Sequence, residues 1–131
     1  MKRFGVSLED DLLRELDRLV QKHKLPNRSQ AIRFLIRKTL IREDCQGNKL
    51  VTGCLAIVYD HHKRELLNKL VCLQHDFHHL ILSGQHVHLD HDNCLETILL
   101  KGRAKELNDL AKKMIGLKGI KSGELITCPI R

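Results

Sequence analysis

The stretch LILSGQHVHLDHDNCLETILLKG, residues 80–102, contains two apolar runs separated by a short polar segment. The first run ends at Asp90 and the second begins at Cys94, with His91 and Asn93 in the segment between them. Short apolar runs bounded by turn-forming residues are typical of β-strands, and a connection of a few residues favours an antiparallel hairpin. This stretch therefore predicts a β-hairpin.

The sequence predicts a strand and then a helix before this hairpin, and a helix and then a strand after it. Residues 62–75 and 104–116 repeat leucines at helical spacing, whereas 51–60 and 123–128 are short apolar runs. The resulting order, β-α-β-β-α-β, is that of a ferredoxin-like domain. We therefore expect an α+β fold for this part of the chain.

The first 45 residues follow a different pattern. KRFGVSL, residues 2–8, alternates and places Phe4, Val6 and Leu8 on one face, which predicts a half-buried strand. Two amphipathic helices follow. A single strand cannot stand alone, and so short a segment buries too little surface to fold by itself. We expect the strand to pair with the same strand of a second chain across a two-fold axis.

These patterns divide the chain into an N-terminal domain at 1–45, a linker at 46–51 and a C-terminal domain at 52–131. The basic residues exceed the acidic ones by 23 to 16, which gives a net charge of +7. Eight of the basic residues lie between Arg18 and Arg42, where no acidic residue occurs. This run is either a solvated helix face or a phosphate-binding surface.

The composition also indicates the compartment. The five cysteines are odd in number and irregularly spaced, which argues against a disulfide framework. Residues 1–13 carry acidic residues where a signal peptide would be apolar, and no uncharged apolar run of about 18 residues is present. We therefore expect a cytoplasmic protein that does not enter a membrane.

The hairpin concentrates side chains that bind transition metals. His86 and His88 are two residues apart on the predicted strand and share a face, and Cys94 begins the next strand. The hairpin can therefore bring two imidazoles and one thiolate together, a donor set that suits zinc, copper or nickel. Glu96 shares the strand parity of Cys94 and is either an acceptor for an imidazole N–H or an exposed acid.

A closed site needs a fourth ligand, and the segment QHDFHH, residues 74–79, offers three histidines. The candidates there are His75, His78 and His79, at the end of the predicted helix. His91 lies in the turn and is either a ligand or exposed. The residues alone leave these alternatives open.

Together these motifs resemble the NikR-type nickel-responsive transcription regulators. LEDDLL, NRSQAIR, HKR, HVH and C-L-E stand in the order and spacing of that family, over nearly the whole chain. The resemblance implies a ribbon-helix-helix (β-α-α) DNA-binding domain followed by an ACT-type metal-binding domain. It also implies a homotetramer built as a dimer of dimers, which binds a palindromic operator in double-stranded DNA.

The resemblance further implies a square-planar Ni(II) site with one ion per subunit. The family's ligands fall on His86, His88 and Cys94 of one subunit and on His75 of a neighbouring subunit. Gln74 and Glu96 match residues that lie beside the metal ligands in the family. The residues that match the family's DNA-contacting positions are Arg3, Gly5, Ser7, Arg28, Ser29, Lys63 and Arg64. The first three would face the major groove, and the others would contact phosphates.

Two departures from the family pattern stand out. Gly5 offers no side chain where better-known members carry a hydroxyl residue, so we expect a different base preference. Gln30 and Phe34 stand where well-studied members have acidic residues that help hold an alkali-metal ion between the domains. We expect no such site in the same form.

The leading interpretation is a repressor of nickel-uptake genes in which Ni(II) promotes operator binding, and not an enzyme. One alternative keeps the architecture but responds to zinc, copper or cobalt. A second is an ACT-domain regulator that responds to a small molecule. A third is a zinc hydrolase, which would need an open coordination position and a general base. The sequence contains no His-Glu-x-x-His motif, which argues against the hydrolase.

Overall fold

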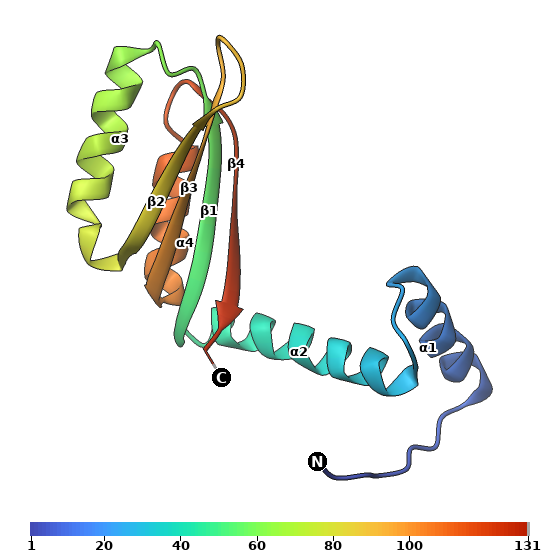
Figure 1. Ribbon diagram of the computed structural model, residues 1–131. Helices are drawn as coiled ribbons and strands as arrows, with labels where there is room; N and C mark the ends of the chain where they lie inside the picture. Colours follow the sequence, from blue (N-terminus) through green and yellow to red (C-terminus); the bar gives the residue numbers. More distant parts are fainter. Residues whose placement is uncertain (131) are drawn as a thin grey trace. The chain divides into compact units, whose positions relative to one another are not determined.

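The computed structural model describes residues 1–130, apart from the side chains of residues 44–46. The chain forms two compact units, which meet in sequence between Leu40 and Ile41 (Figure 1). No helix among the described residues is long and apolar enough to cross a membrane.

The N-terminal unit contains the two helices that the sequence predicts. They are α1 (Asp10–Lys22) and α2 (Arg28–Gln46), and α2 continues past the end of the unit. Asn27 caps α2, because its Oδ1 accepts a hydrogen bond of 2.9 Å from the backbone N–H of Gln30. Residues 1–9 precede α1 and form no strand in the single chain. A strand needs a neighbour to pair with, and this unit offers no second strand within the described chain.

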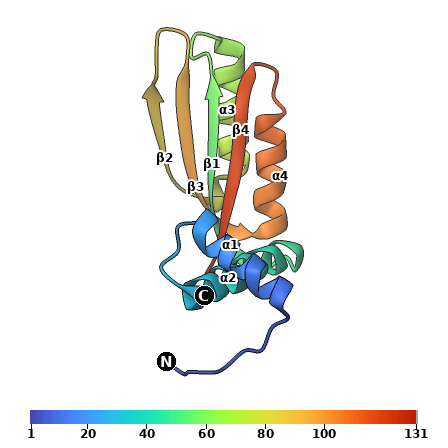
Figure 2. The same cartoon turned by 90° about the vertical axis from the view of Figure 1, so that its right-hand side faces the viewer.

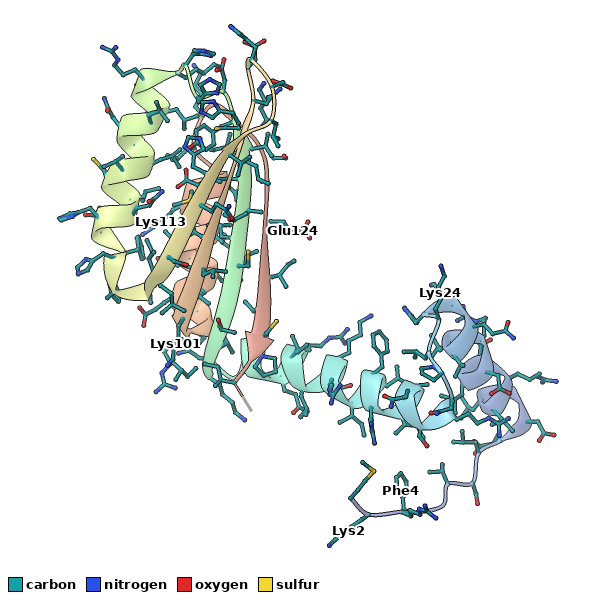
Figure 3. All side chains as sticks on the ribbon, viewed as in Figure 1. Lys2, Phe4, Lys24, Lys101, Lys113 and Glu124 are labelled. Carbon is teal, nitrogen blue, oxygen red and sulfur yellow. The ribbon has the colours of Figure 1, made fainter. Side chains whose placement is uncertain are left out.

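The N-terminal unit buries little apolar surface. Among its described hydrophobic residues, Leu16 and Ala31 are buried. The exposed ones include Phe4, which is 75% exposed, together with Val6, Leu8, Leu12, Leu35 and Ile36. Lys2 and Phe4 extend from the segment that precedes α1 (Figure 3). One copy of this unit therefore has no sizeable core of its own.

The C-terminal unit confirms the predicted β-α-β-β-α-β order. Its elements are β1 (Leu50–Tyr59), α3 (Arg64–Asp76), the 3-10 turn η1 (His78–Leu80), β2 (Ile81–His88), β3 (Cys94–Arg103), α4 (Ala104–Ile115) and β4 (Ile120–Pro129). The four strands form one sheet in the order β2-β3-β1-β4, and all neighbouring pairs are antiparallel. The predicted hairpin is therefore β2 and β3.

The two helices α3 and α4 cover the same face of this sheet (Figure 2). The core lies between the sheet and these helices, and its fully buried side chains include Leu55 and Ile57 of β1 and Leu107 and Met114 of α4. No helix covers the other face within the described unit, and Ile126 is 63% exposed there. Glu124 also projects from β4 on this uncovered side (Figure 3).

Candidate metal centre and DNA-contacting residues

The pairing of β2 with β3 places the predicted hairpin ligands on one face. His88 lies opposite Cys94, and His86 lies opposite Glu96. Side chains of directly opposed residues in antiparallel strands leave the sheet on the same side. Ile98 has the same parity as Cys94 and lies in the core under the helices. All four side chains therefore belong to the helix-covered face, at the end of the sheet where the hairpin turns.

Cys94 is the buried member of this set, with no exposed surface. Its Sγ donates a hydrogen bond of 3.3 Å to the backbone carbonyl of Tyr59, which lies opposite it on β1. Burial raises the pKa of the Cys94 thiol, while the hydrogen bonds with Tyr59 act in the opposite direction. A thiol must lose its proton to bind a metal ion, so metal binding here is coupled to proton release.

Glu96 lies beside the histidines and joins three elements of the fold. The Tyr59 hydroxyl donates to Glu96 Oε1 at 2.6 Å, and Gln74 Nε2 donates to Glu96 Oε2 at 2.7 Å. Burial, followed by the neighbouring Glu96 carboxylate, raises the pKa of Tyr59, so its hydroxyl stays a neutral donor. Glu96 thus accepts from Tyr59 and Gln74 on this face, whereas the sequence left open an acceptor for an imidazole N–H or an exposed acid.

Tyr59 is a residue of this site that sequence reasoning missed. Its ring stacks near that of His86, with a centroid separation of 6.0 Å. Tyr59 continues the alternating apolar pattern of β1, which is typical of a core residue. The only signal was its place directly before Asp60, His61 and His62, at the end of a strand.

The chemistry of the donor set fits a borderline transition metal, since it offers imidazole nitrogens and a thiol sulfur. The donor atoms of His86, His88 and Cys94 do not all lie within 4.8 Å of one another in the single chain. The rings of His86 and His88 are 5.4 Å apart between centroids. His75 lies near the end of α3, and its ring is 6.0 Å from that of His78. The structure therefore brings three candidate ligands to one face and leaves His75 on another element.

The predicted DNA-contacting residues of the N-terminal unit are exposed. Arg3, Gly5 and Ser7 lie in the extended segment before α1, and Ser29 lies in the first turn of α2. Arg28 forms a two-pronged ion pair with a residue of α1. Its Nε and one terminal nitrogen lie 2.9 and 3.1 Å from the two carboxylate oxygens of Asp17. The pair raises the pKa of Arg28 and lowers that of Asp17, mainly through these hydrogen bonds.

Lys63 and Arg64, the predicted contacts of the second domain, stand at the N-terminus of α3. They line a hollow of about 340 Å³ together with Glu65, Lys69 and Lys118. The N-terminal end of a helix carries a partial positive charge, and Lys63, Arg64 and Lys118 add to it, whereas Glu65 pairs with Lys69 at 3.5 Å. This corner of the unit is therefore suited to a negatively charged group.

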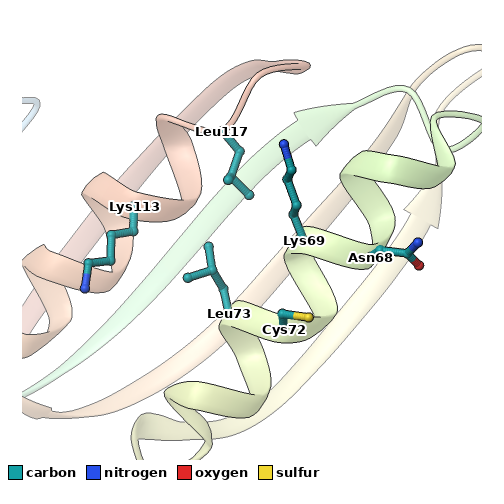
Figure 4. Close-up of a pocket in the computed structure, with 6 residues that line it drawn as sticks. All are labelled: Asn68, Lys69, Cys72, Leu73, Lys113 and Leu117. Atoms are coloured by element: carbon teal, nitrogen blue, oxygen red, sulfur yellow. The ribbon is translucent and has the colours of Figure 1, made fainter.

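A different hollow, of about 430 Å³, lies between α3 and α4 (Figure 4). Its lining residues are Asn68, Lys69, Cys72, Leu73, Lys113 and Leu117. Lys69 and Lys113 point in different directions, so their charges do not converge on one ligand (Figure 4). Binding pockets for small molecules combine an apolar wall with a few convergent polar groups. This hollow therefore gives little support to a small-molecule effector.

Residues 52–128 match the family described as the NikR C terminal nickel binding domain. Residues 2–43 match the ribbon-helix-helix proteins of the copG family. The chain belongs to the NikR family. Membership of this family identifies the protein as a transcription regulator and not an enzyme.

Two relatives show how far the similarity to this NikR-family chain extends. A protein of Syntrophus aciditrophicus is 46% identical over 123 residues, which cover 94% of this chain and 90% of that protein. A protein of Desulfovibrio desulfuricans is 50% identical over 123 residues, which cover 94% of this chain and 89% of the relative. Both are provisionally named nickel-responsive regulators.

A solved structure also resembles this NikR-family chain in fold. It is that of an uncharacterized protein from Thermotoga maritima, with a TM-score of 0.52 and 18% sequence identity. The similarity covers 63% of this chain and all of the other chain. At this identity, the similarity shows the fold alone.

Proposed function

We propose that this NikR-family protein is a cytoplasmic, nickel-responsive regulator that represses genes for nickel uptake. The observation that carries the proposal is the presence of a transition-metal donor set in one unit and a ribbon-helix-helix match in the other. The names of the two relatives support nickel as the effector.

The proposed Ni(II) site takes His86, His88 and Cys94 from one subunit and His75 from a neighbour, with one ion per subunit. The shared face of the hairpin residues and the burial of Cys94 support the first three. The placement of His75 on α3 is consistent with a role across an interface. When bound, nickel would act as a cross-link that favours one arrangement of the subunits. The four ligand residues would supply its donor atoms, and Glu96 would help to hold the side chains around them in place.

The proposed assembly is a homotetramer made of two dimers. The exposed apolar residues of the N-terminal unit support pairing with a second copy, because one copy buries almost none of them. The uncovered face of the sheet, with Leu99 and Ile126 exposed, supports a second interface. We place the domain boundaries at 1–45 and 52–131, with a linker at 46–51.

The proposed DNA contacts divide into two classes. Arg3, Gly5 and Ser7 would face the bases of a palindromic operator, in the major groove. The phosphate contacts would be Arg28, Ser29, Lys63 and Arg64. For Arg28, DNA phosphate competes with Asp17, since the guanidinium already holds two carboxylate oxygens.

The regulation requires only that nickel bind the DNA-competent arrangement more tightly than the others. A ligand shifts a conformational equilibrium by its difference in affinity for the two states. Because no proposed ligand lies in residues 1–45, nickel would leave the base contacts themselves unchanged. It would instead affect whether two N-terminal dimers reach two half-sites together.

The test is binding of the purified protein to the DNA upstream of its own gene, with each metal alone. We expect Ni(II) to strengthen binding to this DNA and not to a shuffled sequence. Zn(II), Cu(II) and Co(II) are the comparison arms. Equal binding with and without every metal would contradict the proposal, and stronger binding with another metal would reassign the effector.

The hydroxyl of Tyr59 gives a first prediction about the metal centre. We expect Tyr59→Phe to weaken Ni(II) binding about tenfold. Loss of a hydrogen-bonding residue next to the metal ligands usually lowers metal affinity by about 10- to 100-fold, and this is the lower end of that range. The cause is the loss of the 2.6 Å hydrogen bond that holds Glu96. Affinity is measured by competition with a chelator of known strength.

Thr52→Val is the matched control for this substitution. It removes a hydroxyl from the other end of β1, where Thr52 bonds to the carbonyl of Leu100 at 2.9 Å. The control should keep wild-type nickel affinity. If Tyr59→Phe binds nickel as tightly as the control, Glu96 does not need its tyrosine partner to support the centre.

A second prediction concerns the origin of the fourth ligand. Chains with His75→Ala and chains with Cys94→Ala should each lack the tight site. Mixed tetramers of the two should regain some complete sites, because each chain supplies what the other lacks. Nickel titration of verified mixed tetramers measures this recovery. Tetramers that regain no tight site would favour a ligand set within one subunit.

A further inference from the structure

Asp17 is the last acidic residue before the basic run that begins at Arg18, and the next acid along the chain is Glu43. It lies on α1 and forms an ion pair with Arg28, the first residue of α2. Arg28 Nε donates to one carboxylate oxygen at 2.9 Å, and Nη2 donates to the other at 3.1 Å. The pair therefore occupies one two-nitrogen edge of the guanidinium.

This edge of Arg28 is suited equally to a phosphate. A carboxylate and a phosphate each offer two oxygens that a guanidinium holds through two parallel N–H bonds. A phosphate that took this edge would have to displace Asp17. A phosphate that took the remaining nitrogen would meet a guanidinium whose charge a carboxylate already balances. The hydrogen bonds from Arg28 lower the pKa of Asp17, so this carboxylate is charged at neutral pH.

The pair lies beside the segment that is proposed to face the bases. Arg28 and Ser7 line one hollow of about 400 Å³ in the N-terminal unit, together with apolar side chains that include Leu16 and Ile32. Arg28 also stands at the N-terminal end of a helix of 19 residues, where the helix dipole favours an anion. A phosphate bound there would be attracted by the dipole and the guanidinium and repelled by the carboxylate of Asp17.

The exposure of the pair limits its value as a structural tie between α1 and α2. The side chains of Arg28 and Asp17 are 58% and 49% exposed. An ion pair in such contact with water contributes little to folding, because solvent screens the two charges. The pair therefore matters more for the charge that Arg28 presents to a ligand than for the stability of the unit.

We propose that Asp17 is an intramolecular competitor of DNA phosphate, which occupies Arg28 in the free protein and lowers the affinity for DNA of any sequence. Arg28 is a phosphate contact in the proposed function, on which this role of Asp17 rests. Phosphate contacts carry no sequence information, so the effect is the same on operator and random DNA. By weakening the phosphate contribution, Asp17 makes stable binding depend more on the base contacts and on nickel.

The experiment measures binding of the full chain to a random duplex and to the DNA upstream of its own gene, with and without saturating Ni(II). Asp17→Asn keeps the shape of the side chain and removes its charge. It should tighten binding to both duplexes about five- to tenfold at about 0.1 M salt, because the freed guanidinium neutralises one more phosphate. For the same reason, the slope of log affinity against log salt should steepen by about one unit.

The matched control is Glu15→Gln. Glu15 is an acid of the same helix that pairs with Arg18 at 2.7 Å, and the side chains of Glu15 and Arg18 are 59% and 58% exposed. This variant changes the net charge equally but frees an arginine outside the proposed DNA contacts, so it should tighten binding much less. In a chain that also carries Arg28→Ala, Asp17→Asn should tighten binding no more than Glu15→Gln does.

Weaker DNA binding by Asp17→Asn would overturn the competition, because Asp17 would then hold Arg28 in place for DNA. A gain that only equals that of Glu15→Gln, or that persists without Arg28, would also overturn it, because the gain would then come from net charge. If the wild type still binds its upstream DNA in response to nickel, these results leave the proposed function standing. A wild type that binds no DNA with any metal would contradict both.

Discussion

Replacing Cys94 by serine is expected to remove tight Ni(II) binding and, with it, nickel-dependent binding to the operator. The loss should exceed about 100-fold in affinity, because substitution of partners that only surround a ligand already costs about 10- to 100-fold. Cys94 is the sole sulfur among the proposed ligands, and a serine hydroxyl is a much poorer ligand for nickel than a thiolate. The absorption band from sulfur-to-nickel charge transfer should disappear together with the affinity.

Cys72→Ser and Cys128→Ser are the controls for this result, since both thiols are exposed and lie outside the proposed centre. They should keep the band and the affinity. Nickel affinity of the wild type should also fall as the pH falls, because protons compete for the imidazoles and for a thiol whose pKa burial has raised. A Cys94→Ser protein that retains the band would show that another cysteine supplies the sulfur.

The β-α-β-β-α-β unit was predictable because each of its strands finds its neighbours within the chain. The alternation of Val51, Leu55 and Tyr59 indicates one buried face, and the short turn before Cys94 indicates an antiparallel pair. Those two facts also place His86 and His88 on the same face as Cys94. The part of the site that depends on local pattern and strand register could therefore be predicted from the sequence.

The remaining parts depend on contacts that a linear pattern does not encode. The strand predicted at residues 2–8 does not form in one chain, because its pairing partner would have to come from another copy. The ion pair of Arg28 with Asp17 joins residues 11 positions apart on two helices, so it follows from how those helices pack. The hydrogen bond from Tyr59 to Glu96 links residues 37 positions apart. Such contacts follow from tertiary structure and not from spacing.

Arg3→Ala is expected to weaken binding to the specific operator by about 1–3 kcal/mol and to relax base preference at the contacted position. The reason is that successive residues of the N-terminal segment alternate between two faces. Phe4 and Val6 are apolar and suited to a dimer core, so Arg3 belongs to the opposite face, toward DNA. An arginine there can hold two acceptors of a guanine edge in the major groove, and alanine cannot. Competition between operator and random DNA at fixed salt and saturating nickel measures the loss.

Lys63→Ala provides the contrast that separates base readout from phosphate binding. Lys63 is exposed beside Arg64 and Lys118, at the N-terminus of α3, where a phosphate would be attracted whatever the sequence. Its loss should weaken binding to all DNA sequences and lower the slope of log affinity against log salt by about one unit. Arg3→Ala should instead change the ratio between operator and random DNA. If Arg3→Ala discriminates between the two as well as the wild type does, the N-terminal segment does not read the operator, and sequence recognition must come from another surface.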